Sequence, residues 1–355
     1  MKNIFLESHN VDNLCFGFGQ FNYHLIMALS EIETPEYKIT LHAQNILPLK
    51  KEFGNKFNYK RYFSLRRYPL FRICKKYDLW HSMNQNTKVE PHGDLPYLLT
   101  VHNISHIQNP ESYKHLDNHV KFQAKLSRSS AIVYISQYAK ESTHRFFEVP
   151  NVPEFVIYNG NTISEINLPE NHLPKMLPDG PFLFTIGQIS ERKNFIALVD
   201  FMAQLPDYKL VIAGKDSTKA ATEIRQRLAD LKLQGRIFLI GEINDFDKQY
   251  YYQQCEAFVF PSLREGFGLP IIEAMRFGKP VFISNNTSLP EIGGGLAHYW
   301  DHYDPAYMRD VFEKGMHVFQ QNPQQNSEML IERSKVFSWQ KAAREYSEVY
   351  RMLLK

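Results

Sequence analysis

The stretch Pro261-Ser-Leu-Arg-Glu-Gly-Phe-Gly-Leu-Pro-Ile-Ile-Glu273 decides the fold of this chain. It follows the short apolar run Ala257–Phe260, which is typical of a buried strand. Pro270 suits the start of a helix, because the first helical residues need no amide donor. The sequence therefore predicts a strand, a glycine turn and a helix, with Glu265 in the loop before the helix and Glu273 in the first helical turn.

This strand, turn and helix would bring an anion-binding backbone and two carboxylates together. Free amides at a helix start attract anions, and Gly266 and Gly268 carry no side chain that would keep a ligand from the backbone. Glu265 and Glu273 can accept hydrogen bonds from adjacent hydroxyl groups, as on ribose or a hexose. Either glutamate alone could equally be a structural partner of the helix start. The whole ordered string favours a site for a nucleotide-sugar.

Short apolar runs alternate with helical patterns along most of the chain, which predicts an α/β fold with parallel sheets covered by helices. The strands form two series, so we expect two doubly wound, Rossmann-like domains, residues 1–165 and 166–337, joined by the polar, proline-rich segment 161–180. Residues 338–355 are typical of an amphipathic helix that Ser338 caps. The expected strands are Ile4–Glu7, Tyr37–His42, Tyr97–Val101, Ala131–Ile135, Phe155–Tyr158, Phe182–Ile186, Tyr208–Ala213, Arg236–Ile240, Ala257–Phe260 and Pro280–Ile283. The other expected helices include Gln20–Ser30, Gln137–Phe147, Ile196–Leu205, Thr218–Leu231 and Phe246–Cys255.

The bulk composition is that of a globular protein with room for two cores: 355 residues, 43% hydrophobic and 22% charged. The net charge of +3 is too small to indicate nucleic acid as the main partner. No apolar run approaches the ~18 residues that span a bilayer, and the amino terminus lacks the apolar core of a signal peptide. The three cysteines lie far apart, which suggests reduced thiols in a cytoplasmic protein.

One region, residues 48–78, is rich in both basic and aromatic side chains. Ten of its residues are Lys or Arg and only two are acidic. Cations near an anionic leaflet each contribute about 1 kcal/mol, and aromatic side chains suit the membrane interface. The region could therefore bind the inner face of the cytoplasmic membrane or an anionic acceptor. The alternative is a solvated face of the first domain, with some aromatic side chains turned into its core.

A second motif follows the expected strand Phe182–Ile186. Gly187 allows a tight exit from the strand, and Arg192 and Lys193 then precede a helix. When a bond between a sugar and a diphosphate breaks, negative charge builds on the diphosphate. Cations fixed at that point stabilise the transition state more than the ground state. Taken alone, the pair could equally be two solvated cations beside a helix start.

Near the amino terminus, the stretch Cys15-Phe-Gly-Phe-Gly-Gln-Phe-Asn22 leads from a strand into a helix. It is not a dinucleotide-binding fingerprint, because Asn22 stands where the third glycine should be and no acidic residue ends the next strand at the right place. Gly17 and Gly19 would instead permit a ligand to approach the backbone closely.

His102 follows the expected strand Tyr97–Val101, at the sheet edge where doubly wound folds bind ligands. We therefore expect it in the functional site. A zinc site with His106 is not expected, because no glutamate follows His102 and the segment is typical of a loop. We expect structural roles for other histidines of this half, including His9 and His24.

The string from Pro261 to Glu273 resembles the E-x7-E motif of retaining glycosyltransferases with the GT-B fold, family 4 in particular. The stretch from Gly187 to Asn194 resembles the phosphate-binding motif of that family, and other matches run along the whole chain. Gln188 and Asn103 depart from the family pattern, in which Arg or Thr and Asp are common at these positions.

The resemblance implies two Rossmann-like domains that face a central cleft, with the helix 338–355 packing back on the first domain. It implies that Arg192 and Lys193 hold the diphosphate, and that Glu265 holds sugar hydroxyls and favours positive charge at the anomeric carbon. His102 would orient the sugar or the incoming nucleophile. These four residues are the candidates for catalysis. The donor-binding candidates, with the first expected on the ribose, are Glu273, Gly17, Gly19, Gly187, Gly266, Phe267, Gly268 and Leu269.

As a member of this family, the protein would move a hexose, with mannose as the first candidate, from a GDP- or UDP-linked donor. The acceptor would be a glycan or a lipid-linked molecule in cell-surface polysaccharide synthesis. The resemblance implies a retaining reaction that needs no metal and no other cofactor. Two alternatives stay open: a GT-B epimerase or phosphorylase, and a nucleotide-sugar-binding protein that has lost catalysis. The departures at Gln188 and Asn103 motivate the second alternative.

Overall fold

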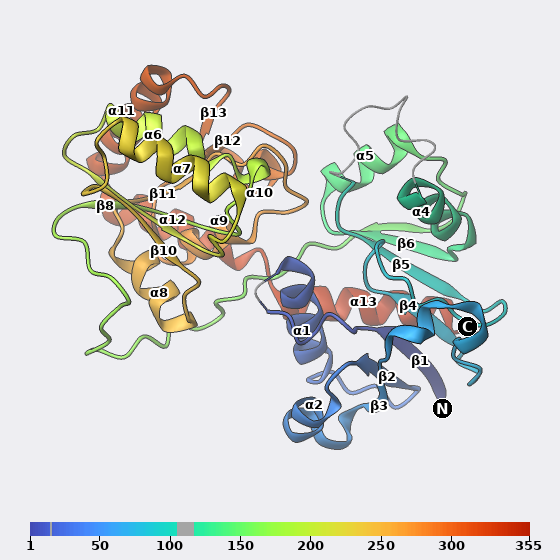
Figure 1. The fold of residues 1–355 in the computed structure, drawn as a ribbon. Helices are drawn as coiled ribbons and strands as arrows, with labels where there is room; N and C mark the ends of the chain where they lie inside the picture. Colours follow the sequence, from blue (N-terminus) through green and yellow to red (C-terminus); the bar gives the residue numbers. More distant parts are fainter. Residues whose placement is uncertain (15, 105–116) are drawn as a thin grey trace. The chain divides into compact units, whose positions relative to one another are not determined.

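The computed structural model describes residues 1–14, 16–104 and 117–355. It divides the chain into two compact units (Figure 1). Unit 1 comprises Met1–Thr162 and Phe337–Lys355, and unit 2 comprises Ile163–Val336. Residue 15 and residues 105–116, and with them the zinc question at His106, lie outside the described residues.

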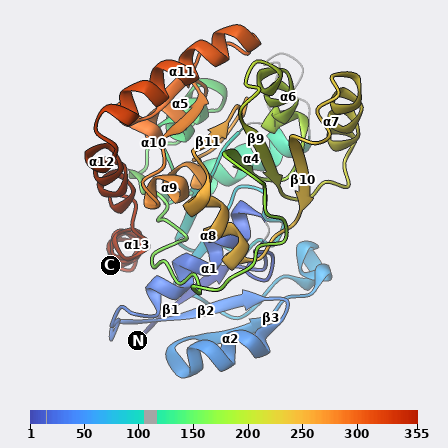
Figure 2. The same cartoon turned by 90° about the vertical axis from the view of Figure 1, so that its left-hand side faces the viewer.

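Unit 1 is built on a parallel sheet of seven strands in the order β3-β2-β1-β4-β5-β6-β7. Its central strands β4 and β5 are buried along their whole length because the sheet is covered on both faces. Figure 2 shows α2 beside β3. The elements are β1 (Lys2–Glu7), β2 (Tyr37–Ala43), β3 (Asn58–Arg61), β4 (Leu79–Ser82), β5 (Tyr97–Val101), β6 (Ala131–Tyr134), β7 (Glu154–Val156), α1 (Gly17–Leu29), α2 (Ile46–Phe53), α4 (Asp117–Arg128), α5 (Gln137–Phe146) and α13 (Trp339–Leu353).

The last helix of the chain, α13, is part of unit 1 and lies beside α1 (Figure 1). Ser338 caps it, because its side chain accepts a hydrogen bond at 3.3 Å from a backbone amide of the first turn. Buried polar contacts join the helix to the sheet: Tyr346 Oη lies 3.0 Å from Thr100 Oγ1. Tyr350 Oη lies 2.8 Å from His81 Nδ1. Because these partners lie on β5 and β4, the helix forms part of the core of unit 1.

Unit 2 is built on a parallel sheet of six strands in the order β10-β9-β8-β11-β12-β13. Figure 2 shows α6 and α7 side by side. Within the described residues of both units, every helix is too short or too polar to cross a membrane. The elements are β8 (Phe182–Ile186), β9 (Lys209–Ala213), β10 (Ile237–Gly241), β11 (Ala257–Phe260), β12 (Val281–Ser284), β13 (His298–Trp300), α6 (Phe195–Ala203), α7 (Lys219–Asp230), α8 (Asp245–Gln254), α9 (Leu269–Arg276), α10 (Leu289–Gly293), α11 (Pro305–Gln321) and α12 (Pro323–Lys335).

The segment expected to join the two domains packs in part against α8. His172 Nε2 lies 2.7 Å from Asp247 Oδ1. The Met176 amide donates to Tyr251 Oη at 3.0 Å. Its polar and proline-rich composition suggested a linker, but from residue 163 onward the segment belongs to unit 2.

Both sheets show the reversal of strand order that defines a doubly wound fold. β1 lies between β2 and β4, and β8 lies between β9 and β11. In such sheets, ligands bind outside the carboxyl ends of the strands where the order reverses. The predicted α/β fold with two doubly wound domains is confirmed. The strand order places the expected ligand sites at the carboxyl ends of β1 and β4 in unit 1, and of β8 and β11 in unit 2.

Candidate functional site

The carboxyl ends of β8 and β11 hold three of the four candidate catalytic residues. The chain leaves β8 through Gly187 and the short 3₁₀ turn Glu191–Lys193, which leads into α6. It leaves β11 through the loop 261–268, which leads into α9. Because β8 and β11 are neighbours in the sheet, side chains of the turn and the loop come into contact.

The Glu265 carboxylate is the centre of this contact. Its Oε1 accepts hydrogen bonds from Lys193 Nζ at 2.6 Å and from Ser262 Oγ at 2.7 Å. The same oxygen lies 2.9 Å from Arg192 Nη1, which also donates to the Arg264 carbonyl at 2.6 Å. All of these contacts fall on Oε1. Within the described part of the chain, Oε2 therefore keeps its capacity to accept a hydrogen bond from a hydroxyl group.

Burial and charge act in opposite directions on this ion pair. Burial raises the pKa of Glu265, but the charges of Lys193 and Arg192 and the hydrogen bonds to the carboxylate lower it below its ordinary value. Burial lowers the pKa of Lys193, and the charge of Glu265 offsets this only in part. Lys193 Nζ lies 4.5 Å from the centre of the Phe260 ring, a contact that favours the cation. Two cations thus lie against the single carboxylate oxygen Oε1 of Glu265.

Gly187 provides the space that this arrangement needs. Its φ of 150° lies in the region that favours glycine. A Cβ at this position would lie 3.1 Å from Cε and 3.4 Å from Nζ of Lys193. The carbonyl of Gly187 is also crowded, since a Cβ at Gly214 would lie 2.0 Å from its oxygen. Within the part of the chain that the structure describes, no side chain therefore lies between the backbone at the end of β8 and the buried Lys193.

Glu273 lies in α9, but not in its first turn, so that prediction was wrong. The helix begins at Leu269, which makes Glu273 its fifth residue, and the first turn contains no acidic residue. The helix begins one residue before Pro270 because Gly268, with a φ of 119°, directs the chain into it. A contact between Glu273 and the helix-start amides is therefore not the reason for its position.

The buried Glu273 carboxylate is bound instead by side chains of α8. Its Oε2 accepts a hydrogen bond from Tyr252 Oη at 2.8 Å, and its Oε1 lies 3.7 Å from Lys248 Nζ. Burial lowers the pKa of Lys248, but the charges of Glu273 and Asp245 outweigh burial and raise it. The sequence analysis missed Lys248 and Tyr252. Their i, i+4 spacing on α8 puts them on one helix face, and it is the signal that could have found them.

The turn between β11 and α9 is held in place by the residues before α10. The Glu265 amide donates to Thr287 Oγ1 at 3.0 Å. Ser288 Oγ donates to the Glu265 carbonyl at 3.1 Å and to the Phe267 carbonyl at 2.9 Å. Phe267 itself is buried. The backbone of the turn is therefore fixed before any ligand binds.

The remaining donor-binding candidates of unit 2, Gly266, Gly268 and Leu269, complete this turn. Gly266 is buried in the loop, and Leu269 is the first residue of α9. A Cβ at Gly268 would lie 3.0 Å from Leu289 Cδ2, and its positive φ already favours glycine. Gly268 is thus required by the turn itself, in addition to any contact with a ligand.

Two glycine candidates lie in unit 1, at the start of α1. Gly17 is the first residue of the helix and is exposed, and among the described residues no heavy atom outside its chain neighbours and its own helix backbone lies within 4 Å of a Cβ built on it. Gly19 is buried, and a Cβ there would lie 1.9 Å from the Asn13 carbonyl oxygen. Packing therefore requires Gly19, whereas Gly17 has open space beside it.

His102 follows β5 and is buried in unit 1. The centre of its ring lies 4.9 Å from that of Phe18 and 4.5 Å from that of Phe21. Its Nε2 lies 2.9 Å from the Met83 carbonyl oxygen, so this nitrogen carries the proton and donates it. Burial lowers the pKa of His102 to about 4. The imidazole is therefore neutral at pH 7, and its Nδ1 can accept a hydrogen bond.

We call Gly187, Arg192, Lys193 and Glu265 the switch-point cluster, since they lie where the strand order of unit 2 reverses. The structure brings these four predicted residues together. Glu273 has its own contacts with α8 in the same unit. The turn into α9, also in unit 2, is formed by Gly266, Phe267, Gly268 and Leu269. Unit 1 contains the last three candidates, Gly17, Gly19 and His102.

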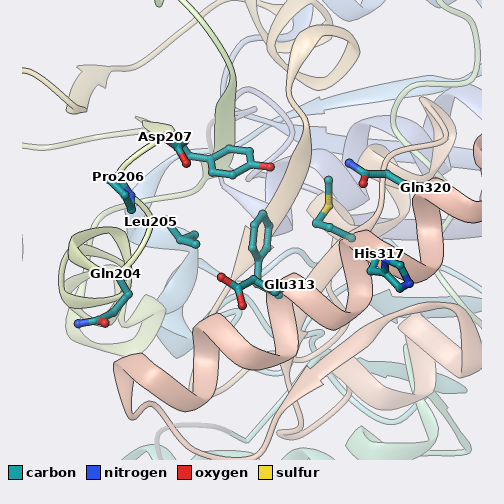
Figure 3. Close-up of a pocket in the computed structure, with 10 residues that line it drawn as sticks. Gln204, Leu205, Pro206, Asp207, Glu313, His317 and Gln320 are labelled. Atoms are coloured by element: carbon teal, nitrogen blue, oxygen red, sulfur yellow. The ribbon is translucent and has the colours of Figure 1, made fainter.

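A pocket of about 250 Å³ lies elsewhere in unit 2, between the residues before β9 and the helix α11 (Figure 3). Asp207, Glu313 and His317 line it, and the rings of Tyr208 and Phe312 pack edge to face with centres 5.4 Å apart. It lies at the amino edge of the sheet, opposite the edge that carries the switch-point cluster. Across the described residues, no group of three or more His, Cys, Asp or Glu side chains is placed to hold a metal ion.

Residues 172–294, which include the switch-point cluster, match the family model of glycosyl transferases group 1. Among curated proteins, the serotype-specific mannosyltransferase WbdA of Escherichia coli is 31% identical over 245 residues, which cover 64% of this chain and 30% of that protein. The O-antigen chain mannosyltransferase B of Escherichia coli is 26% identical over 382 residues, which cover 95% of this chain and 96% of that protein. This chain thus spans less than a third of the length of WbdA.

Solved structures share the fold over the whole chain. Sucrose-phosphate synthase from Thermosynechococcus elongatus aligns with a TM-score of 0.74 at 17% identity and covers 99% of both chains. HepE from Anabaena, in complex with UDP and glucose, aligns with a TM-score of 0.69 at 15% identity, over 99% of this chain and 100% of that one. These likenesses show the fold. The GT-B fold expected from the sequence is confirmed.

Proposed function

We propose that this protein transfers a hexose from a nucleoside diphosphate sugar. It has the GT-B fold, and its residues 172–294 match the family model of glycosyl transferases group 1. The acceptor is a glycan or a lipid-linked molecule of cell-surface polysaccharide synthesis. The observation that carries the proposal is the switch-point cluster, where Glu265 lies 2.6 Å from one cation and 2.9 Å from another. The relative named as an O-antigen chain mannosyltransferase supports the acceptor class.

Arg192 and Lys193 would hold the diphosphate of the donor. Negative charge builds on this leaving group as its bond to the sugar breaks, so cations fixed beside it lower the barrier. Lys193 is the more buried of the two, with 9% of its side chain exposed against 37% for Arg192. In a less polar environment the same charge interacts more strongly. We therefore expect Lys193 to contribute more to turnover than Arg192.

Glu265 would act on the sugar rather than on the phosphates. Its Oε1 is occupied by the cations and its Oε2 can accept a hydrogen bond from a sugar hydroxyl. The lowered pKa keeps the carboxylate ionised, which favours positive charge at the anomeric carbon as the bond to the diphosphate breaks. We assign no covalent bond to Glu265. Retention of the anomeric configuration is part of the proposal and rests on the E-x7-E resemblance.

The reaction is proposed to need no metal ion. Arg192 and Lys193 supply two positive charges at the place where other enzymes use a divalent cation. Gln188 replaces a residue that is often cationic in the family, so these two side chains carry the neutralisation alone. Full activity in excess EDTA is the expected result. Activity that is lost in EDTA and returns only with Mg²⁺ or Mn²⁺ would contradict this part of the proposal.

GDP-mannose is the first donor to test. The mannosyltransferase relatives support it, and a UDP-linked hexose is the second choice because HepE has been solved with UDP-glucose. Glu273 would accept hydrogen bonds from the ribose hydroxyls, in addition to those it receives from α8. His102 would accept a hydrogen bond from the sugar or the nucleophile through Nδ1.

The deciding experiment measures binding before transfer. Thermal unfolding is followed with UDP, GDP, ADP and their sugars; a nucleotide at a hundred times its Kd stabilises a protein by about 2.7 kcal/mol. Transfer from the nucleotide-sugar that binds is then measured, and the product configuration is read by NMR. If no nucleotide shifts the unfolding temperature, the proposal fails. Rapid isomerisation of the donor without an acceptor would favour an epimerase, and binding without any turnover would favour a binding protein.

We also propose that part of the region 48–78 binds an anionic membrane surface. Phe53, Phe57 and Tyr77 are buried in unit 1 and belong to its core. The segment 63–71 differs, because its large apolar side chains are exposed, the most exposed at 87%. These side chains are Phe63, Leu65, Tyr68, Leu70 and Phe71.

Exposed cations flank the 63–71 segment on both sides. They include Arg61 before it and Lys75 and Lys76 after it, with Arg67 inside it. An apolar segment that is rimmed by cations suits the interface of an anionic leaflet, where each cation near the surface contributes about 1 kcal/mol. The segment is therefore the part of the region that we expect to touch the membrane.

Co-sedimentation with vesicles of phosphatidylglycerol and phosphatidylcholine tests this contact. Leu70→Ser with Phe71→Ser should weaken binding, since both side chains are exposed and would enter the interface. Leu173→Ser is the matched control, because Leu173 is 84% exposed in unit 2. The proposal predicts that binding falls as salt rises. The membrane contact would be contradicted if the wild type did not bind anionic vesicles at low salt. It would also be contradicted if the double variant at Leu70 and Phe71 bound as well as the Leu173→Ser control.

A further inference from the structure

A cluster of ionisable side chains at the ends of β1 and β2 has no part in the function proposed above. Glu7, the last residue of β1, is fully buried, and its carboxylate contacts two histidines. His9 Nδ1 lies 2.8 and 2.9 Å from its two oxygens, and His42 Nδ1 lies 3.0 Å from Oε1. Burial raises the pKa of Glu7, but the hydrogen bonds from His42 and His9 outweigh burial and lower it to about 2. The carboxylate is therefore ionised at neutral pH.

The position of His9 in the fold is that of a ligand site. β1 lies between β2 and β4, where the strand order of unit 1 reverses, and His9 follows the carboxyl end of β1. Doubly wound sheets bind ligands at this edge. The His9 ring stacks on Tyr62, with ring centres 4.6 Å apart and planes 13° apart. The His9 side chain is 23% exposed, so one side of the ring can be reached from solvent.

The two ring nitrogens of His9 differ in their partners. The carboxylate of Glu7 holds Nδ1, whereas Nε2 has no protein partner within the described residues. His81, by contrast, is fully buried and uses both nitrogens: Nδ1 lies 2.8 Å from Tyr350 Oη and Nε2 lies 2.8 Å from Thr100 Oγ1. The Nε2 of His42 also lacks a hydrogen-bond partner in the described part of the chain, but it is buried, whereas the side chain of His9 is partly exposed. An imidazole is suited to bind a ligand when a carboxylate fixes one ring nitrogen and the other has no hydrogen-bond partner in the protein.

We propose that His9 binds the acceptor: its Nε2 makes a hydrogen bond with a hexose hydroxyl, and Glu7 is the positioning residue that fixes the ring. A hydroxyl group both donates and accepts, so it can pair with Nε2 whether or not that nitrogen carries a proton. The inference rests on the proposed glycosyltransferase function and names a residue for its acceptor side. It replaces the expectation from the sequence that His9 is only structural.

The experiment uses GDP-mannose as donor and octyl α-mannopyranoside as the acceptor probe, with octyl glucoside and octyl galactoside as further probes. His9→Gln and His9→Ala remove the imidazole, and Glu7→Gln removes the charge that holds it. His144→Ala is the matched control. His144 Nε2 lies 2.7 Å from Glu154 Oε2, so it is a second histidine–carboxylate pair of unit 1. Glu154 is the first residue of β7, which puts this pair at the amino edge of the sheet.

We expect both His9 variants to raise the acceptor KM about tenfold or more, which is the factor expected when one hydrogen bond to the acceptor is lost. Their GDP affinity in thermal unfolding and their hydrolysis of the donor by water should stay at wild-type values. Glu7→Gln should raise the acceptor KM by a smaller factor, with GDP affinity unchanged. Circular dichroism checks that every variant folds. Because His9 is partly exposed, the His9 variants should fold and test the inference even if Glu7→Gln unfolds.

Three outcomes would count against these proposals, and they separate the two. An unchanged acceptor KM in both His9 variants, or an equal rise in His144→Ala, would overturn the role of His9 and leave glycosyl transfer intact. A wild-type protein that binds GDP but uses none of the three octyl hexosides would overturn the hexose hydroxyl as the partner of His9. A wild-type protein that binds no nucleotide would overturn the proposed function itself.

Discussion

Glu265 and Glu273 belong to one motif, yet they have different electrostatic partners. Glu265 contacts two cations of the turn after β8, Arg192 and Lys193. Glu273 contacts α8, where Lys248 supplies the cation. A substitution at Glu265 should therefore affect turnover most, because it disturbs the cations proposed to hold the leaving group. A substitution at Glu273 should affect nucleotide affinity and the packing of α9 on α8.

Lys193→Ala should lower kcat by about 10²-fold or more, since the developing charge on the diphosphate would lose a buried cation. Initial rates at saturating donor measure the effect, and circular dichroism checks the fold. Lys219→Ala is the control in the same unit, because the Lys219 side chain is 83% exposed and pairs with Glu223 on its own helix. A wild-type kcat for Lys193→Ala would remove Lys193 from the catalytic residues.

The buried histidines His81 and His102 should make unit 1 less stable in mild acid. Burial lowers their pKa values from 6.5 to about 3 and about 4. As the pH falls below 6.5, the unfolded chain binds protons that the folded chain does not, so the free energy of unfolding falls until these lowered pKa values are reached. The expected loss at pH 5 is about 2 kcal/mol for each histidine.

Urea unfolding followed by tryptophan fluorescence between pH 8 and pH 5 measures this loss. The His102→Gln variant should lose about 2 kcal/mol less than the wild type between pH 8 and pH 5, because the contribution of His102 is gone. A free energy of unfolding that stays constant over this range in the wild type would show that the two histidines are not held neutral.

At the scale of single elements, α1 contains two glycines with opposite requirements. Gly19→Ala should destabilise the protein by about 1–3 kcal/mol, because its Cβ would lie 1.9 Å from the Asn13 carbonyl oxygen. Gly17→Ala should be neutral or stabilising by up to about 1 kcal/mol, since its Cβ would meet open space among the described residues and alanine favours the helix. Thermal unfolding measures both effects. Equal destabilisation by the two substitutions would contradict the packing described here.

The same pair of variants tests the proposed ligand contact at Gly17. If the donor approaches the backbone of Gly17, the added methyl group should lower the transfer rate while stability is kept. An unchanged rate would remove Gly17 from the donor-binding candidates. Gly19→Ala cannot decide this question, because loss of stability and loss of contact would occur together.

The accuracy of the strand predictions depended on whether the strand is an unbroken apolar run. The strands β5, β8 and β11 have the bounds that their apolar runs predict. The sequence analysis missed β3, β4 and β13, which have three or four residues each. Unlike the equally short but apolar β11, each of them contains polar residues, so no apolar run marks it, and neighbouring strands stabilise it. β4 also contains the polar His81, whose hydrogen bonds to β5 and α13 appear only in the fold.

At the scale of the whole molecule, α13 joins the end of the chain to the unit that contains its beginning. Removing residues 337–355 should destabilise unit 1, because Tyr346 and Tyr350 would no longer bond to β5 and β4. Hydrogen exchange read by mass spectrometry should rise in the peptides of β4 and β5 and stay the same in unit 2. Removing only Leu354 and Lys355, which follow α13, is the control. Equal exchange in the truncated and full chains would show that α13 is dispensable.

Local patterns in the chain were enough to predict two doubly wound units and the strand, glycine turn and helix that carry Glu265 and Glu273. Apolar runs, glycines and prolines act on their immediate neighbours, so their effect can be read without knowing the fold. The three-dimensional fold was needed to show which side chains meet. Lys193 and Glu265, and Lys248 and Glu273, are brought together by strand order and by the faces that helices turn inward. Glu7 and His9 lie two residues apart in the sequence. The fold was needed to show that they lie where the strand order of the sheet reverses, because strands from distant parts of the chain form that point.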